Sequence, residues 1–282
     1  MQHFRLEAVA PGAYAAISIH GTGSVGNAGF VDLGGSTVVF DTFLTPQAAE
    51  ALRAEAERVA PVRWVVNSHA HGDHIRGNMA FPGAPIISTE RTRELIVENA
   101  LPQLERMKAT PVEEALAEAE DDDDRATILQ IADSIDRLEQ RVPDVTFAER
   151  LTLHGADGRA HLTTFGGGHT PSDAILWLPD VRVCFAGDLV VIETHPTMGH
   201  GDAEQWLVIL ERIEALEPAV IVPGHGRVGT ARDVEPLRAY LASMLADHDR
   251  PPEPGWTWPQ VHARNAELLR TRGAALSTKE SR

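Results

Sequence analysis

The sequence has little of several residues and patterns that mark particular classes of protein. Cys184 is the single cysteine, so the chain cannot form an intrachain disulfide, and we expect a reducing compartment. The chain has no run of about eighteen apolar residues, and its first residues lack the apolar core of a signal peptide. These features predict a soluble cytoplasmic protein that does not insert into a membrane.

Basic residues are also scarce. The formal net charge is −16, and Lys108 and Lys279 are the only lysines. A surface of this charge repels nucleic acid unless basic residues gather locally, and the sequence shows no basic stripe. The composition therefore argues against nucleic acid as a partner and favours a small-molecule substrate.

The most informative segment follows a short apolar run of the kind that ends a buried strand. It reads Asn-Ser-His69-Ala-His71-Gly72-Asp73-His74. Side chains alternate along an extended segment, so His69 and His71 point to the same side and can bind one metal ion. After a turn at Gly72, the adjacent Asp73 and His74 diverge and can serve a second ion. The segment predicts a metal site; a polar loop with solvated histidines is the alternative.

This H-x-H-x-D-H motif resembles the signature of the metallo-β-lactamase superfamily. Members of that family take further metal ligands from three later loops, each at the end of a strand. Matching residues occur here in the same order, with His169 after Gly-Gly-Gly, Asp188 after Ala-Gly and His225 after Pro-Gly. The resemblance covers about residues 12–230, and no ligand position is missing.

The resemblance implies an α/β fold, an αββα sandwich that forms a single domain over residues 1–282. With 43% hydrophobic residues, the chain can bury a sizeable core. Residues 28–40 predict a hairpin that turns at two glycines, and a helix is expected from Pro46 to about Ala60. Strand-like segments return in the second half of the chain, and residues 231–282 predict C-terminal helices.

Residues 90–142 interrupt this pattern with two or three predicted helices. Thr110-Pro111-Val-Glu113 matches a capping box, and Asp121–Asp124 predicts a solvated bend. Apolar residues then recur every three or four positions, at Ile128, Ile131, Ile135, Leu138 and Val142. Insertions at this point in the resembling family lie over the active site or in a dimer interface. We expect a cap over the site, with an interface in a homodimer as the alternative.

The resemblance also implies a ligand set and a mechanism. One ion is held by His69, His71 and His169, the other by Asp73, His74 and His225, and Asp188 bridges the two ions together with a hydroxide. The hydroxide is the nucleophile, the second ion polarises the substrate oxygen, and Asp73 relays a proton to the leaving group. We expect two divalent metal ions, with zinc as the default for an imidazole-rich site and manganese or iron as alternatives.

The residue at position 188 separates branches of the resembling family. True β-lactamases usually lack an aspartate there, whereas thioesterase-, lactonase- and phosphodiesterase-like members have one. Tyr14 and Tyr240, the only tyrosines, match no tyrosine motif of the lactonases. We expect hydrolysis of a small ester, thioester or lactone. The alternatives are a β-lactamase-like amide hydrolase, a phosphodiesterase, a mono-iron persulfide dioxygenase and a non-catalytic binding protein.

The loop at residues 193–201 lies where the resembling enzymes contact substrate. It contains His195 and His200, which are therefore candidate substrate contacts. Met198 and Trp206 are expected to supply apolar walls to a pocket that admits only small molecules.

Overall fold

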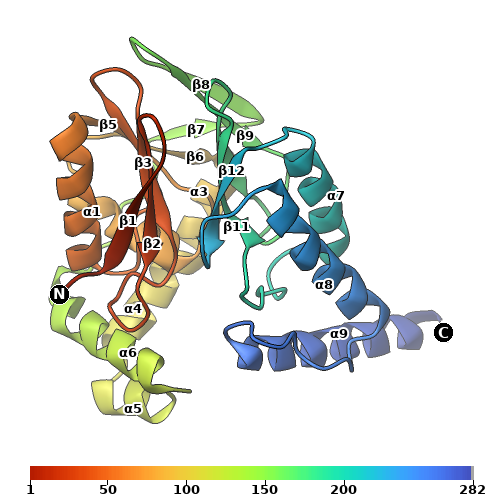
Figure 1. Cartoon of the computed structure of the whole chain (residues 1–282). Coiled ribbons are helices and arrows are strands. Elements are labelled where there is room, and N and C mark those ends of the chain that lie inside the picture. The colour runs from red at the N-terminus through yellow and green to blue at the C-terminus, as the bar shows by residue number, and fades with distance from the viewer. Residues whose placement is uncertain (281–282) are drawn as a thin grey trace.

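Two β-sheets form the centre of the molecule, and helices cover the outer face of each sheet (Figure 1). The computed structural model describes the backbone of residues 1–280 and the side chains of residues 1–272. Helix α1 (Pro46–Val59) covers one sheet, and helices α7 (Ala203–Glu214) and α8 (Val234–Ala246) cover the other. This is the αββα arrangement that the sequence predicts.

The first sheet contains seven strands in chain order. They are β1 (Phe4–Ala10), β2 (Ala13–Ser18), β3 (Ala28–Asp32), β4 (Thr37–Phe40), β5 (Val62–Val66), β6 (Ile86–Thr89) and β7 (Val145–Phe147). Strands β1 to β4 pair antiparallel, which confirms the predicted hairpin, and β4 to β7 pair parallel. Strand β4 is buried throughout, as expected for a strand covered on both faces, whereas in β5 only Val65 and Val66 are buried and Arg63 is exposed.

The second sheet has five strands, in the order β12-β11-β10-β9-β8. They are β8 (Arg150–His154), β9 (Arg159–Thr164), β10 (Ala174–Leu178), β11 (Val183–Val191) and β12 (Val220–His225). All nine residues of β11 are buried, including Cys184 and Asp188. Asp188 therefore lies within a strand rather than after one. Burial raises the pKa of the Cys184 thiol to about 12, so this cysteine is a core residue.

The main core lies between the two sheets. It includes Phe40 and Val66 from the first sheet and Leu176 and Phe185 from the second. The metal motif follows the carboxyl end of β5, where the chain forms the short helix α2 (Gly72–Ile75) and the 3₁₀ turn η1 (Arg76–Ala80). The carboxyl ends of strands in an open sheet are the usual place for a ligand site.

Helix α7 illustrates how the sequence places an outer helix. The Asp202 carboxylate accepts hydrogen bonds from the backbone N–H groups of Glu204 and Gln205, which satisfies two donors at the start of the helix. The buried face of the helix packs on the second sheet and consists of Trp206, Ile209, Leu210 and Ile213. The cap and the apolar face together explain why these residues form a helix on the outer side of the second sheet.

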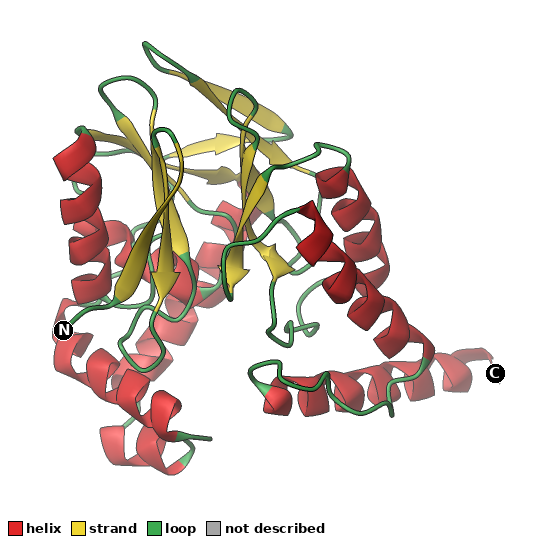
Figure 2. Cartoon of the chain, in the orientation of Figure 1, coloured by secondary structure: helices red, strands yellow, loops and turns green. Residues whose placement is uncertain are grey.

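The segment at residues 90–142 is helical throughout its first part, as Figure 2 shows. It forms α3 (Glu90–Leu95), the π-helical turn η2 (Ile96–Ala100), α4 (Leu101–Ala109), α5 (Val112–Ala117), α6 (Asp122–Ser134) and the 3₁₀ turn η3 (Ile135–Arg137). Because α3, η2 and α4 follow one another without a break, the segment forms three continuous helical runs, at residues 90–109, 112–117 and 122–137, in agreement with the two or three helices predicted.

Two local predictions in this segment are wrong. Thr110 does not cap α5, because its hydroxyl donates back to the carbonyl of Arg106 and Pro111 precedes the helix instead. The run Asp121–Asp124 is not a bend, because the Asp121 side chain accepts from the Asp124 N–H and caps α6. Carboxylates in the first turn of a helix are stabilised by its dipole, which explains the acidic run.

The C-terminal part contains the 3₁₀ turn η4 (Ala231–Asp233), α8 and α9 (Pro259–Glu280). The start of α9 is tied to the loop at residues 194–198 by buried polar side chains. Asn265 donates to the carbonyl of Pro196 at 2.7 Å and accepts from the Met198 N–H at 3.0 Å. His262 is hydrogen-bonded to the Tyr240 hydroxyl at 3.0 Å. These contacts hold the start of α9 beside the loop that follows β11.

None of the helices in residues 1–280 combines the length and the apolar character needed to cross a membrane.

Gly29 of β3 tests the close packing of the two sheets. A Cβ atom at this position would overlap the Phe185 ring and would lie 2.5 Å from the Tyr14 carbonyl oxygen. We expect Gly29→Ala to lower the free energy of unfolding by about 1–3 kcal/mol, because an overpacked core must shift. Urea denaturation measures the change. The matched control is Gly83→Ala, since nothing lies within 4 Å of a Cβ there. Equal stability of the two variants would contradict this account.

Candidate metal centre

The loop that carries the metal motif is closed by a pair of asparagines at its two ends. Asn67 and Asn78 donate to each other's side-chain oxygens at 3.0 and 2.9 Å. The Asn67 amide also donates to the backbone carbonyl of His74 at 3.2 Å, and the Thr42 hydroxyl donates to Asn78 at 3.0 Å. These bonds are buried, so the loop has a defined conformation.

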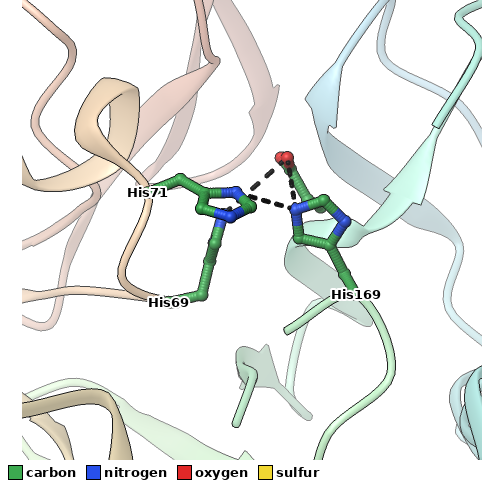
Figure 3. Close-up of side chains that lie close together, drawn as sticks. His69, His71 and His169 are labelled. Carbon is green, nitrogen blue, oxygen red and sulfur yellow. Dashed lines mark hydrogen bonds and ion pairs between the residues drawn. The ribbon is translucent and has the colours of Figure 1, made fainter. Parts of the chain in front are cut away.

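All seven predicted ligands converge between the ends of the two sheets. They form one group of His69, His71, His169 and Asp188, and a second group of Asp73, His74 and His225. Within each group the possible ligand atoms lie within 4.8 Å of one another. Figure 3 shows His69, His71 and His169 with their rings gathered around a common point.

Asp188 lies between the two groups. Its Oδ2 atom is 3.2 Å from His169 Nε2 in the first group and 3.3 Å from His225 Nε2 in the second. Its Oδ1 atom is 3.2 Å from His74 Nε2. One carboxylate thus faces ligands of both groups, which is the position that a bridging ligand requires.

The donor set fits divalent metal ions. Buried ring nitrogens are normally hydrogen-bonded, yet His69 Nε2 and His74 Nε2 are buried without a hydrogen-bond partner, as is Asp188 Oδ1. An ion bound at ~2.0–2.1 Å in tetrahedral geometry separates its ligand atoms by ~3.3–3.4 Å. The observed separation of His74 Nε2 and Asp73 Oδ2 is 3.3 Å, and that of His225 Nε2 and Asp73 Oδ2 is 3.4 Å.

The protonation states of several ligands suit metal binding. Burial and, to a lesser extent, the neighbouring His169 lower the pKa of His71 to about 3. Burial also holds the pKa of His69 well below its ordinary value. Burial raises the pKa of Asp188, but His225 and the other facing imidazoles outweigh it and hold the pKa of this carboxyl well below its usual range. Neutral imidazoles and an ionised carboxylate are the forms that bind a cation.

Two of the ligand imidazoles have pKa values above the ordinary value for histidine. Burial lowers the pKa of His74, but the facing carboxylates of Asp73 and Asp188 raise it well above the ordinary value. The pKa of His169 is raised in the same way, because Asp188 outweighs the effect of burial. A cation that binds here displaces protons from these rings, so metal binding and proton release are coupled.

Asp41 supports the site, although no motif in the sequence indicates its role. It follows β4, is fully buried, and adopts a φ of 60°, which is uncommon for a residue other than glycine. Its Oδ2 atom accepts from His74 Nδ1 at 2.8 Å and from the Ser68 hydroxyl at 2.7 Å, while Oδ1 accepts from the Ser68 N–H at 2.8 Å. This bond fixes the His74 tautomer and turns Nε2 toward the centre.

Asp173 has a similar role for His169. Its carboxylate accepts hydrogen bonds from the N–H groups of Gly168 and Thr170 and from the Thr170 hydroxyl, at 2.8–3.2 Å. The loop that carries His169 is therefore folded around a buried aspartate. The signal in the sequence is the segment His-Thr-Pro-Ser-Asp, in which short polar residues follow a ligand.

The two candidate substrate histidines occupy different positions. His195 is 1% exposed, and both ring nitrogens are engaged by the backbone, Nδ1 by the Thr257 carbonyl at 2.8 Å and Nε2 by the Glu253 N–H at 3.0 Å. The structure therefore places it away from the ligand groups, in a structural position. His200 lies beside them, with its Nδ1 atom 2.8 Å from Nε2 of His71.

A cavity of about 530 Å³ opens onto the ligands. Its floor contains His71, Asp73, His169, Asp188 and His225. Its outer wall comes from Val25, from Glu118, Glu120 and Asp124 of the α5–α6 region, and from Trp258, Gln260, Val261 and Arg264 at the start of α9. Met198 and Trp206, the apolar walls expected from the sequence, are instead buried in the core of the second sheet.

Known proteins resemble this chain in sequence. The family model described as the metallo-beta-lactamase superfamily matches residues 21–225. A metallo-beta-lactamase type 2 of Bacteroides fragilis is 24% identical over 115 residues, which are 39% of this chain and 46% of that protein. A linear primary-alkylsulfatase of Pseudomonas sp. (strain ATCC 19151) is 24% identical over 238 residues, 76% of this chain and 44% of that protein. The chain thus spans less than half the length of either relative.

The fold has counterparts among solved structures. A metallo-beta-lactamase from Pontibacter korlensis has a TM-score of 0.64, with 22% sequence identity, over 85% of this chain and 99% of that one. This likeness confirms the predicted sandwich fold. The family match covers most of the chain and contains all seven predicted ligands. The chain therefore belongs to the metallo-beta-lactamase superfamily, whose members are metal-dependent hydrolases.

Proposed function

We propose that this protein is a binuclear metal-dependent hydrolase that acts on a small ester, thioester or lactone. The observation that carries the proposal is the position of Asp188, whose two oxygens face ligands of both groups. Two divalent ions held there supply an activated water as the nucleophile and a Lewis acid for the substrate oxygen. Zinc suits the imidazole-rich set, and manganese or iron are the alternatives.

The chain's own residues then have distinct tasks. His69, His71 and His169 hold the first position, and Asp73, His74 and His225 hold the second. Asp41 orients the His74 ring through a hydrogen bond, and Asp173 folds the loop that carries His169. Ligands supported in this way keep their geometry when substrate binds, which favours a fast chemical step.

Asp73 is positioned to handle a proton. It lines the cavity, and its Oδ2 atom contacts His74 Nε2 and His225 Nε2. Burial raises the pKa of Asp73, but His74 outweighs this effect and keeps the pKa below its usual range, so the carboxylate is ionised at neutral pH. An ionised carboxylate at the cavity surface can accept the proton of the nucleophile and pass it to the leaving group.

Several observations distinguish the candidate reactions. A cavity of about 530 Å³ suits a small molecule and excludes a polymer. A mono-iron oxygenase needs only one ligand group, whereas the structure assembles two. The two relatives are named for a β-lactam substrate and an alkyl sulfate. Substrates of those classes are commonly anionic, and the acidic outer wall of this cavity disfavours them.

Metal content gives the first test. The two ligand groups predict about two transition-metal ions per chain, mainly zinc, by elemental analysis of the protein after dialysis. A single tightly bound iron together with oxygen consumption would replace the hydrolase with the oxygenase alternative.

Replacement of Asp188 gives the second test. Asp188→Asn keeps the shape of the side chain and removes the negative charge shared by the two groups. We expect loss of one metal ion per chain and a fall in turnover of more than about a hundredfold. The control is Asp180→Asn, because Asp180 is exposed on the surface and, within residues 1–272, its one ion pair is with Arg159, at 3.8 Å. Full metal content in Asp188→Asn would show that this carboxylate does not bridge.

A substrate panel gives the third test. Zinc-loaded protein is offered p-nitrophenyl esters, an acyl thioester, a set of lactones, bis-p-nitrophenyl phosphate and a chromogenic β-lactam under identical conditions. We expect hydrolysis of one of the carbonyl classes and weak or no cleavage of the β-lactam, because Asp188 is typical of the general hydrolases. Efficient β-lactam cleavage with untouched esters would overturn the proposal, and activity on the phosphodiester alone would make the protein a phosphodiesterase.

A further inference from the structure

The outer wall of the cavity above the ligands supplies no metal ligand, whereas the floor of the cavity consists of metal ligands. The wall is formed by two segments that are far apart in the sequence, residues 118–124 and residues 258–264. In Figure 1 these are the α5–α6 region at the lower left and the start of α9 near the bottom centre, at the end of the helix away from the C mark. Because neither segment supplies a metal ligand, the charge of this wall acts on the part of the substrate that lies away from the reacting bond.

The outer wall carries more acidic side chains than basic ones. Arg264 is the one arginine or lysine among the described residues that line the cavity, and it pairs with Glu120 at 2.7 Å. Glu118 and Asp124 also line the cavity. Neither of them forms an ion pair with a basic side chain in the part of the chain that the structure describes.

The carboxylates of this wall repel one another. The Asp124 carboxylate accepts from the Glu120 N–H at 3.2 Å. Burial raises the pKa of Asp124, and the charges of Asp121 and Glu120 also raise it, so the pKa stays above its ordinary value although the Glu120 N–H and the charge of Arg264 lower it. An added positive charge on the cavity side relieves this repulsion, because carboxylates attract a cation and repel an anion.

An aromatic ring lies in the same cavity. The Trp258 ring is half-buried, lines the cavity, and lies 4.8 Å from the ring of the ligand His225. Trp is the side chain that best attracts an organic cation through the face of its ring. Its position beside His225 places this ring next to the second ligand group.

We propose that the substrate carries a positively charged group, of the ammonium class, which lies between Trp258 and the carboxylates of Glu118 and Asp124 while its ester, thioester or lactone bond faces the ligands. This inference rests on the proposed function, because it names the substrate class of the same cavity. The site is the cavity above the ligand groups, and the acidic residues decide which charge it accepts. An aromatic ring opposite carboxylates is the chemistry that recognises organic ammonium ions.

The test compares esters that differ in charge and little else. Zinc-loaded full-length protein is offered acetylcholine, its uncharged isostere 3,3-dimethylbutyl acetate, and the anion 3-acetoxypropionate. We expect kcat/KM for acetylcholine to exceed that of the neutral ester by about tenfold, mainly through KM, and to fall as salt is added. A preference for the neutral ester would overturn the inference. A preference for the anionic ester that disappears in the Arg264→Gln variant would also overturn it.

Variants of the wall show which residues produce the preference. Glu118→Gln and Asp124→Asn are each expected to raise KM for acetylcholine about three- to fivefold and to leave KM for the neutral ester unchanged. The matched control is Glu113→Gln, since Glu113 is exposed on α5 and does not line the cavity. An equal change for both esters would show a structural effect and contradict the proposal.

Binding without turnover separates this inference from the proposed function. Tetramethylammonium is titrated calorimetrically into the zinc-loaded wild type and into the Glu118→Gln/Asp124→Asn double variant. Binding that weakens about tenfold or more in the double variant supports the ammonium site even if neither ester is hydrolysed, in which case only the ester hydrolase proposal fails. Undetectable binding to the wild type, or equal binding by both proteins, overturns the ammonium site whatever the enzyme hydrolyses.

Discussion

A buried carboxylate surrounded by imidazoles is the constraint on which the rest of the molecule depends. Asp188 is 5% exposed, and an isolated charge at such a depth costs several kcal/mol unless opposite charges compensate it. The strand β11 brings this charge to the place where the ends of both sheets meet. The loop after β5, the loop before β10 and the end of β12 each supply an imidazole that faces it.

Close backbone approach makes this assembly possible. A Cβ atom at Gly224 would overlap the Asp188 carboxylate, and one at Gly187 would lie 2.7 Å from the Ser68 Cβ. Glycine at these positions lets β11, β12 and the metal loop come close enough to share one centre. The same packing brings Ser68 against Asp41, so the ligands and the residues that orient them form one buried hydrogen-bonded unit.

The ligands were predictable from the sequence because their signal is local. Spacing within the motif shows that His69 and His71 share a side, and short glycine-rich turns mark His169 and His225. The role of Asp41 was not predictable, because it depends on a contact across 33 residues of chain with His74. His195 illustrates the converse: its position in the sequence suggested substrate, yet two backbone contacts with residues 253 and 257 occupy its ring.

The helical segment and the cavity wall were predictable only in outline. Helical periodicity indicated helices in residues 90–142, but the capping role of Asp121 depends on the local backbone conformation. The wall residue Trp258 precedes α9, which His262 and Asn265 anchor to α8 and to the loop after β11, and no local pattern encodes such an anchor. The position of a peripheral segment is set by tertiary contacts, whereas a ligand motif is set by covalent spacing.

The ion pair between Arg264 and Glu120 links the two segments of the outer wall, and both side chains are partly exposed, at 60% and 39%. Exposed pairs of this kind stabilise a structure by only about 0–1 kcal/mol. The free-energy cost of breaking this pair is therefore comparable to thermal energy, whereas buried hydrogen bonds hold the centre beneath it. The two segments of the chain that form the wall thus meet at the cavity through a weak polar contact, so a substitution of either partner is expected to alter the wall without disturbing the ligands.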